Sequence, residues 1–400
     1  MISDVYFPRI NGVSTSIQIF RRELERLGCP TLLVAPKFEQ SWDDDERTTR
    51  VGSRPVPLDP EDRLMFPREL LTACRNLAGQ FDVIHIHTPF LAHWVGVKLA
   101  KELGVRSIET YNTYFEEYLH HYAPFVPRWA LRAFARRLSR AQCGSVDAVI
   151  SPSMPMADLL RGYGARSPIE VLATGLDLEQ FEGGDGRRFR AMHGISEDRP
   201  VLLHVGRVAF EKNIGFILDA FSDVRAQVPD ALLVIAGEGP ALQALRKRAI
   251  ASGLEDSVMF VGYLDRESTL LDCYRSANAF VFASNTETQG LVLLEAMAVG
   301  TPVVSTAVLG TKDVLERGDA GAIVVPENRE RFAQATVQLL GDRDLQRRLG
   351  KQGRRYVEQH WSSDVMARRL LELYESLTST GMEHPPARSE IGVDRRTLPG

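Results

Sequence analysis

The sequence predicts an α/β protein built from two doubly wound domains that face each other across a cleft. Its 400 residues exceed what one ordinary hydrophobic core accommodates, which favours two domains. Short apolar runs alternate with amphipathic segments along almost the whole chain, a pattern typical of parallel sheets with crossover helices. The same pattern restarts after a glycine-rich segment at 182–186, which we interpret as a linker.

The first half carries one clear amphipathic helix, predicted over 16–27, where Ile17, Phe20 and Leu24 recur at helical spacing. The opening residues 1–4 resemble the end of a strand. We therefore expect a shortened first strand, or a start assigned a few residues late. Further strands are predicted at 31–35, 82–87, 107–111, 148–151 and 169–173.

The second half repeats this pattern. Strands are predicted at 201–206, 231–237, 258–262, 279–284, 302–305 and 322–326, and helices at 213–227, 344–360 and 363–377. We expect an N-terminal domain over 1–181, a C-terminal domain over 187–360, and a helix at 361–380 that packs back on the N-terminal domain. Residues 381–400 are rich in Pro, Gly and charge and are expected to be disordered.

The composition is that of a soluble globular protein, with 44% apolar and 25% charged residues. A net charge of −4 gives no global positive field for nucleic acid. The four cysteines are scattered and are expected to be reduced thiols of a cytoplasmic protein. No apolar run is long enough to span a membrane. The acidic triplet at 43–45 resembles a metal site, but its polar surroundings favour a solvated surface.

A strand, a polar turn and a helix follow one another over 279–297. Gly290 occupies the expected helix start, where it lets a ligand approach the backbone and where free amides favour an anion such as a diphosphate. Glu287 lies in the turn, and helical geometry places Glu295 on a side that can face the cleft. A carboxylate there suits the two hydroxyls of a ribose.

A second loop, after the strand at 201–206, carries Gly206, Arg207 and Lys212. Two positive charges at the mouth of the cleft suit a departing diphosphate. A third loop brings Gly12 toward the phosphates from the opposite domain. Taken alone, Gly12 favours plain structure, and the basic loop favours a solvated surface; combined with the two glutamates, they favour a donor site.

These residues resemble the retaining glycosyltransferases of family 4, which have the GT-B fold. The resemblance covers nearly the whole chain and rests on Arg207 and Lys212, on the spacing of Glu287 and Glu295, and on 302–304. It also includes Thr174-Gly175-Leu176-Asp177 and Phe181 at the domain junction. It implies two Rossmann-like domains, hexose transfer with retention, and no tightly bound metal or cofactor. It further implies that Arg207 and Lys212 hold the diphosphate, Glu287 the donor sugar and Glu295 the ribose.

The resemblance also implies that backbone amides at Gln289, Gly290 and Leu291 reach the donor, while Tyr263 and Leu264 are expected to border its base. Gln289 stands where many members have Phe, similar to the branch that glycosylates diacylglycerol and related lipids. We therefore expect a nucleoside-diphosphate sugar, UDP- or GDP-linked, as donor. Glucose or mannose is the expected hexose, and a lipid or glycolipid the acceptor.

One position departs from that branch. Members often carry His at the end of a Thr-Tyr-His-Thr strand, and that His contacts the donor sugar. This chain has Asn112 there, which donates a hydrogen bond but neither carries charge nor relays a proton. The candidates to compensate, although each is more often structural, are His85, His87, His120 and His121.

A basic helix is predicted within 122–143, with arginines four residues apart, no acidic residue, and bulky apolar side chains that include Leu131, Phe134 and Leu138. This pattern suggests a contact with an anionic membrane surface, on the inner face of the membrane. The alternative is a helix that packs on its own domain with its arginines in water. The candidate membrane contacts are Arg128, Trp129, Arg132, Arg136, Arg137 and Arg140.

Other functions remain open at this stage. A soluble or polysaccharide acceptor, or a non-catalytic nucleotide-sugar-binding subunit, fits the same donor residues. A sugar-nucleotide epimerase would need acid and base groups around the sugar, and the Arg-Lys and Glu-Glu set points to transfer instead. A NAD-dependent dehydrogenase is disfavoured because no G-x-G-x-x-G opens either half.

Overall fold

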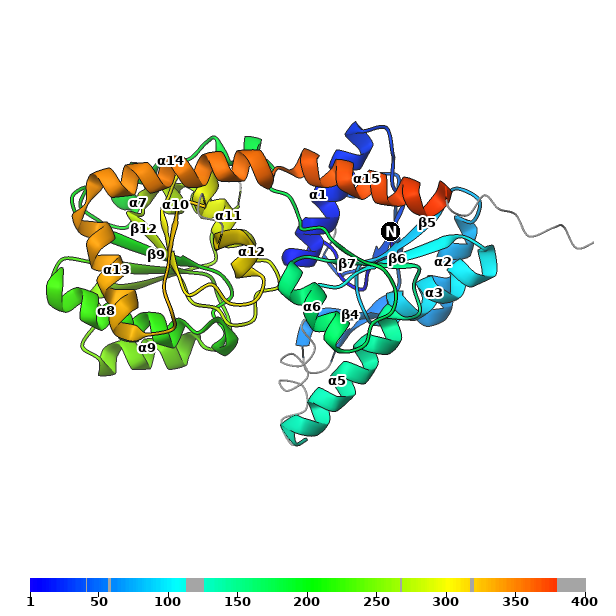
Figure 1. Ribbon diagram of the computed structural model, residues 1–400, viewed down its shortest axis with the longest axis horizontal. Helices are drawn as coiled ribbons and strands as arrows, with labels where there is room; N and C mark the ends of the chain where they lie inside the picture. The colour runs from blue at the N-terminus through cyan, green and yellow to red at the C-terminus, as the bar shows by residue number, and fades with distance from the viewer. Residues whose placement is uncertain (41, 57–58, 113–125, 267, 317–319, 380–400) are drawn as a thin grey trace, which may run out of the picture.

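The computed structural model of the chain describes residues 1–40, 42–56, 59–112, 126–266, 268–316 and 320–379. It contains two Rossmann-like α/β domains, which lie side by side along the long axis of the molecule (Figure 1). The fold class predicted from the sequence is confirmed. The expected disorder of 381–400 concerns residues outside those described.

The N-terminal sheet is parallel, in the order β5-β6-β7-β8, and Ile2 joins it to the β1-β2 pair by bridging both Val34 and Ile86. The first strand is thus reduced to a short bridge. The strands of this sheet are β1 Leu33–Pro36, β2 Thr48–Val51, β5 Val83–Ile86, β6 Arg106–Thr110, β7 Ala148–Ser151 and β8 Ile169–Val171. Its helices are α1 Gly12–Arg26, α2 Pro67–Asn76, α3 Leu91–Leu103, α5 Arg128–Cys143 and α6 Met154–Gly162.

A small antiparallel hairpin, β3 Ser53–Val56 with β4 Asp59–Met65, was not predicted. Its strands are polar and contain prolines, so they lack the apolar alternation by which a strand is recognised. Just before it, Asp44 pairs with Arg50 at 2.7 Å and Asp45 with Arg21 at 2.9 Å. These two carboxylates of the acidic triplet are therefore engaged by arginines of their own domain.

The C-terminal sheet is parallel, in the order β11-β10-β9-β12-β13-β14. Its central strands are buried along their whole length, as apolar strands covered by helices on both faces should be. The strands are β9 Val201–Val205, β10 Leu232–Ala236, β11 Val258–Gly262, β12 Ala279–Phe282, β13 Val303–Ser305 and β14 Ala322–Val324. The helices are α7 Gly186–Met192, α8 Ile214–Gln227, α9 Leu242–Ala251, α10 Thr269–Ser276, α11 Leu291–Ala298, α12 Thr311–Leu315, α13 Arg329–Gly341 and α14 Arg343–His360.

The glycine-rich segment 182–186, which we interpret as a linker, is held in place by α10. Arg275 of α10 donates to the carbonyls of Phe181 and Glu182, both at 3.1 Å. Gly186 begins α7, and a Cβ there would lie 2.3 Å from the Arg275 carbonyl oxygen. The glycine thus permits the close contact between this segment and α10.

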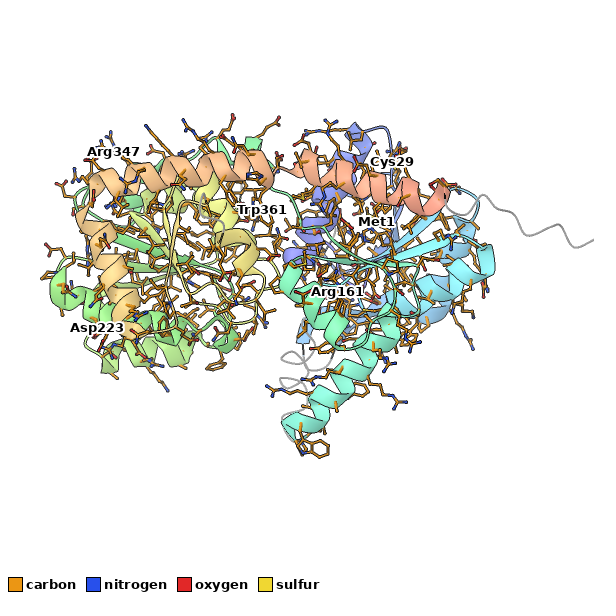
Figure 2. All side chains as sticks on the ribbon, in the orientation of Figure 1. Met1, Cys29, Arg161, Asp223, Arg347 and Trp361 are labelled. Atoms are coloured by element: carbon orange, nitrogen blue, oxygen red, sulfur yellow. The ribbon has the colours of Figure 1, made fainter. Side chains whose placement is uncertain are left out.

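The last helix, α15 Ser363–Ser379, returns to the N-terminal domain. Met366, Ala367 and Leu370 form one buried cluster with Phe20 and Leu24 of α1. α14 and α15 follow one another along the same edge of the molecule, and Trp361 lies at the junction between them (Figures 1 and 2). No helix among the described residues is both long and apolar enough to cross a membrane.

Candidate active site

The segment after β12 forms a turn and then α11, as expected. Gly290 precedes α11 with φ of 93°, a conformation that side chains other than glycine rarely adopt. A Cβ there would also lie 3.0 Å from Thr311. No side chain caps this helix start, so its first amides remain available to an anion.

Lys212 and Glu287 come together across this site. Nζ of Lys212 lies 2.5 Å from Oε1 of Glu287, and their side chains are 20% and 19% exposed. Lys212 ends a single 3-10 turn after β9, which Asn213 closes in the left-handed conformation with φ of 55°. The loop after β9 and the loop after β12 are therefore joined by an ion pair.

Glu295 has partners that the sequence did not reveal. Its carboxylate is 2% exposed and forms an ion pair with Arg266, which follows β11. Tyr274 of α10 donates to the other carboxylate oxygen at 2.8 Å. Proximity to Glu295 raises the pKa of the Arg266 guanidinium, against the effect of burial. Arg266 belongs to no recognisable motif, and it was missed for that reason.

Two glycines after β10 were also missed. A Cβ on Gly237 would lie 2.0 Å from the carbonyl oxygen of Gly206, and one on Gly239 would lie 2.4 Å from that of Val208. The backbone amide of Val208 donates to the backbone carbonyl oxygen of Glu238 at 2.8 Å. The loop that carries Arg207 thus packs directly on the loop after β10. The Gly-Glu-Gly spacing after a predicted strand is the pattern that would have indicated this contact.

Several buried polar atoms at the carboxyl ends of the strands have no hydrogen-bond partner in the part of the chain that the structure describes. Nearly all buried polar groups in proteins are paired, so groups left over at one edge mark where a polar ligand completes the structure. They belong to His87 after β5, Asn112 after β6, Ser153 after β7, Ser284 and Asn285 after β12, and Thr306 after β13.

A buried histidine lies near the Lys212–Glu287 pair. His204 of β9 is fully buried, and its Nδ1 lies 3.2 Å from the carbonyl oxygen of Val281. Burial lowers its pKa to about 4; the Val281 carbonyl and Glu287 oppose this effect, and the charge of Lys212 adds to it. The ring is therefore neutral near pH 7 and contributes no charge to the site.

The two domains meet through loops that follow the carboxyl ends of strands. The Gln289 side chain accepts from the Thr174 amide at 2.9 Å and donates to the Thr174 carbonyl at 2.7 Å. Oγ1 of Thr174 donates to Ser16 of α1 at 2.8 Å. The Met154 amide of α6 donates to the Asp313 carboxylate of α12. Gln289 therefore joins the donor loop to the other domain, and its side chain is not available to a donor.

The remaining predicted donor residues lie on the same loops. The side chain of Arg207 is exposed, and its guanidinium has no hydrogen bond or ion pair with any described residue. Tyr263, directly after β11, is 56% exposed, whereas Leu264 packs against the core of the C-terminal domain. Gly12 is exposed at the start of α1, and a Cβ there would have no atom within 4 Å. Open space at Gly12 is what close approach of a ligand requires.

The predicted basic helix is present as α5, which extends away from the N-terminal sheet (Figure 1). Leu131 and Ala135 are buried against the domain and Leu138 is half-buried, so one side of the helix packs on its own domain. Trp129 is 75% exposed and Phe134 is 57% exposed. The exposed arginines are Arg132, Arg136, Arg137 and Arg140; the side chain of Arg128 lies outside the described part.

No group of three or more His, Cys, Asp or Glu side chains able to hold a metal ion occurs among the described residues. All four cysteines are free thiols, and three of them are buried. Burial raises the pKa of the Cys74 thiol to about 11 and that of Cys143 to about 12. These thiols are therefore protonated near pH 7, which makes them poor nucleophiles.

Comparisons with known proteins identify the family. Residues 185–356 match the family described as "Glycosyl transferases group 1", and residues 10–180 match "Glycosyltransferase Family 4". An alpha-monoglucosyldiacylglycerol synthase of Streptococcus pneumoniae is 33% identical over 319 residues, covering 76% of this chain and 70% of the relative. A GDP-mannose-dependent alpha-(1-6)-phosphatidylinositol monomannoside mannosyltransferase of Mycolicibacterium smegmatis is 26% identical, over 93% of this chain and 97% of the relative.

Solved structures show the same fold. Sucrose-phosphate synthase from Thermosynechococcus elongatus superposes with a TM-score of 0.76 at 23% identity, covering 92% of this chain and 94% of that one. The likeness extends over both domains, as expected for the GT-B fold. The chain belongs to the family 4 glycosyltransferases, which are retaining hexosyltransferases.

Proposed function

We propose that this protein transfers a hexose from a nucleoside-diphosphate sugar to a hydroxyl of a lipid or glycolipid, with retention of configuration. Glucose and mannose are the favoured hexoses. The observation that carries the lipid part is the exposed basic and aromatic surface of α5, on the domain opposite the donor loops.

The donor half of the proposal rests on charge. Arg207 and Lys212 supply cations beside the uncapped start of α11, and together these suit a diphosphate. Lys212 is already paired with Glu287, so a bound diphosphate would share or replace that carboxylate. Glu295 is the proposed acceptor for the ribose hydroxyls. Arg266 and Tyr274 occupy only part of the capacity of its two oxygens.

The proposed chemical step requires no carboxylate nucleophile. The bond between the anomeric carbon and the diphosphate oxygen breaks, and the acceptor oxygen forms its bond on the same face of the sugar. The acceptor proton passes to the departing phosphate oxygen. Arg207 and Lys212 stabilise the negative charge that develops there, and such fixed cations act more strongly in a site shielded from water. Glu287 is proposed to lie against the transferred sugar.

The acceptor half rests on α5. Trp129 and Phe134 expose large apolar surfaces on the same helix as four exposed arginines. Aromatic and basic side chains together favour the interface of an anionic bilayer. The two relatives described above have names that specify diacylglycerol and phosphatidylinositol acceptors, which supports a lipid here.

The proposal is tested by incubating the purified full-length protein with a panel of UDP- and GDP-hexoses and a membrane lipid extract. Mass spectrometry should detect a new glycolipid with one of these donors, and NMR of the product should show the anomeric configuration of the donor. Soluble sugar acceptors are tested in parallel. Transfer to these alone, with none to lipid, would contradict the lipid acceptor and leave the transferase activity standing.

A further inference from the structure

We propose that His87 adds a contact to a subsite for sugar hydroxyls on the N-terminal domain, next to Asn112, the position that the family resemblance associates with the donor sugar. The inference rests on the proposed function for its substrate, a hexose. It assigns to His87 a direct contact with that sugar. The neighbouring His85 has a structural role instead.

The position of His87 is the first argument. It directly follows β5, at the carboxyl end where the interdomain loops converge, and its amide donates to the Ile2 carbonyl at 3.0 Å. The residue is 1% exposed. Neither ring nitrogen has a hydrogen-bond partner among the residues that the structure describes. A neutral imidazole offers one donor and one acceptor, and both are unused here.

The ring of His87 is firmly supported. It stacks on His85 with ring centroids 3.9 Å apart and planes 29° apart. His85 is itself fixed on both sides, with Nδ1 2.6 Å from the hydroxyl of Tyr374 in α15 and Nε2 2.6 Å from the hydroxyl of Thr110 in β6. The polar capacity of His85 is therefore used within the fold. The two ring nitrogens of His87, in contrast, remain available for hydrogen bonds, and stacking on His85 supports the orientation of the ring.

Asn112 brings a second unused donor to the same edge. Its Nδ2 atom is buried and lacks a partner in the described part of the chain. β5 and β6 are adjacent and parallel, with Ile86 opposite Glu109. His87 and Asn112 therefore follow neighbouring strands at the same end of the sheet. Together the ring of His87 and the Nδ2 group of Asn112 offer unused donors and one unused acceptor without adding a charge.

The chemistry of these groups selects the ligand class. Burial, followed by the charge of the amino terminus, lowers the pKa of His87 to about 3, so the ring is neutral at physiological pH. A neutral pair of donor and acceptor matches a hydroxyl, which both donates and accepts. A phosphate would instead require cations, and the proposed phosphate ligands Arg207 and Lys212 belong to the other domain. A hexose ring presents several hydroxyls close together.

The sugar can come from the donor or from a glycolipid acceptor, and kinetics separates the two. In the full-length protein, His87→Ala is expected to raise KM about tenfold for the substrate whose sugar occupies the subsite, since one or two hydrogen bonds are lost. His87→Gln retains a neutral donor and acceptor and should recover part of this loss. Affinity for free UDP or GDP, measured by calorimetry, should not change. His193→Ala, at a half-buried histidine that ends α7, is the matched control.

One outcome is that His87→Ala raises KM for the nucleoside-diphosphate hexose but not for the matching deoxyhexose donor. This result assigns the subsite to the donor sugar. A raised KM for the glycolipid assigns it to the acceptor. The proposal would be overturned by unchanged KM values for both the donor and the glycolipid, in a variant with the melting temperature and nucleotide affinity of the wild type. Should His87→Ala fail to fold, His87→Phe, which keeps an aromatic ring against His85 without the ring nitrogens, carries the same comparison. Hydrolysis of the nucleotide sugar is measured in parallel. KM for the donor can therefore be compared even if no lipid is glycosylated.

Discussion

Glu295 and Arg266 form an ion pair in which the carboxylate is 2% exposed and the guanidinium side chain is 39% exposed. Burial disfavours an ionised carboxylate, and the adjacent guanidinium offsets this effect. Tyr274 completes the arrangement from the buried side. The residue proposed to bind the ribose is thus oriented by two side chains that come from different elements.

Replacing Arg266 by Ala is expected to weaken both folding and nucleotide binding. The carboxylate of Glu295 would lose its cation, and the free energy of unfolding should fall by about 2 kcal/mol, discounted for the partial exposure of the guanidinium. Urea denaturation measures the first effect and calorimetry with UDP or GDP the second. Arg329→Ala removes an exposed pair with Asp223 on α8, and it should cost less than about 1 kcal/mol without changing nucleotide affinity. Equal effects in both variants would contradict a special role for Arg266.

Replacing Lys212 by Met is expected to reduce kcat about 100- to 1000-fold, because it removes a fixed positive charge at the departing phosphate. Steady-state kinetics with the preferred donor measures the effect. Arg248→Met is the control, since it removes a cation paired with Asp219 on α8. A Lys212→Met enzyme that retained wild-type kcat would show that the pair with Glu287 is structural only.

The difference between what local pattern predicts and what it misses is clear at this site. Arg207, Lys212, Glu287 and Gly290 lie where a strand gives way to a helix, and a sequence shows such a transition through its periodicity and its glycine. Arg266 lies in an irregular loop and contacts a residue 29 positions later. Contacts of that kind depend on tertiary packing, and the local spacing of apolar and polar residues does not indicate them.

The same limit applies between the domains. Gln289 was noticed because it departs from a family pattern, yet its contact with Thr174 spans 115 residues of sequence. Most strands of both sheets were predictable because buried parallel strands are continuous apolar runs, whereas the half-buried, polar β2 was not predicted. The β3–β4 hairpin was not predicted either, because most of its residues are polar and, apart from the buried Met65, they are exposed or half-buried where described.

Asp4 should give the protein a measurable pH dependence of stability. Burial raises its pKa from 3.8 to about 6, although Thr88 and the amide of Ala92 donate to it. The folded state therefore binds this proton more tightly than the unfolded state. The contribution of Asp4 to the free energy of unfolding falls by about 3 kcal/mol as pH rises from about 4 to above 6.

The measurement compares urea denaturation of the wild type and Asp4→Asn from pH 4 to 7.5, so that other titrating groups cancel. The advantage of Asp4→Asn should grow with pH. Asp147→Asn should show no comparable change in this range, because the pKa of Asp147 is lowered and its titration lies below about pH 4. Burial opposes ionisation of Asp147, but bonds from the Ser107 amide and Arg106 together lower its pKa. Parallel curves for the wild type and Asp4→Asn would contradict the raised pKa.

Gln289→Glu tests the interdomain contact with almost no change of shape. The new carboxylate faces the Thr174 carbonyl with no proton to donate, so the free energy of unfolding should fall by about 2 kcal/mol. Turnover should fall as well, because the donor loop loses its link to Thr174 and Ser16. Gln346→Glu is the matched control. Gln346 donates to the Leu339 carbonyl within one domain, so its loss should lower stability and leave kcat unchanged. A stable, fully active Gln289→Glu enzyme would show that the contact is dispensable.

The surface of α5 should determine binding to anionic membranes. Each basic residue near such a surface contributes about 1 kcal/mol, so Arg137→Gln with Arg140→Gln should weaken binding to phosphatidylglycerol vesicles about 30-fold at low salt. Trp129→Ala should weaken it further and reduce the salt-resistant fraction, because it removes an apolar anchor. Vesicle sedimentation measures both effects. Arg347→Gln with Arg348→Gln, on the exposed face of α14, makes the same change of charge on the other domain and should have little effect. If both pairs weaken binding equally, the attraction is non-specific, and α5 is a solvated helix of its own domain.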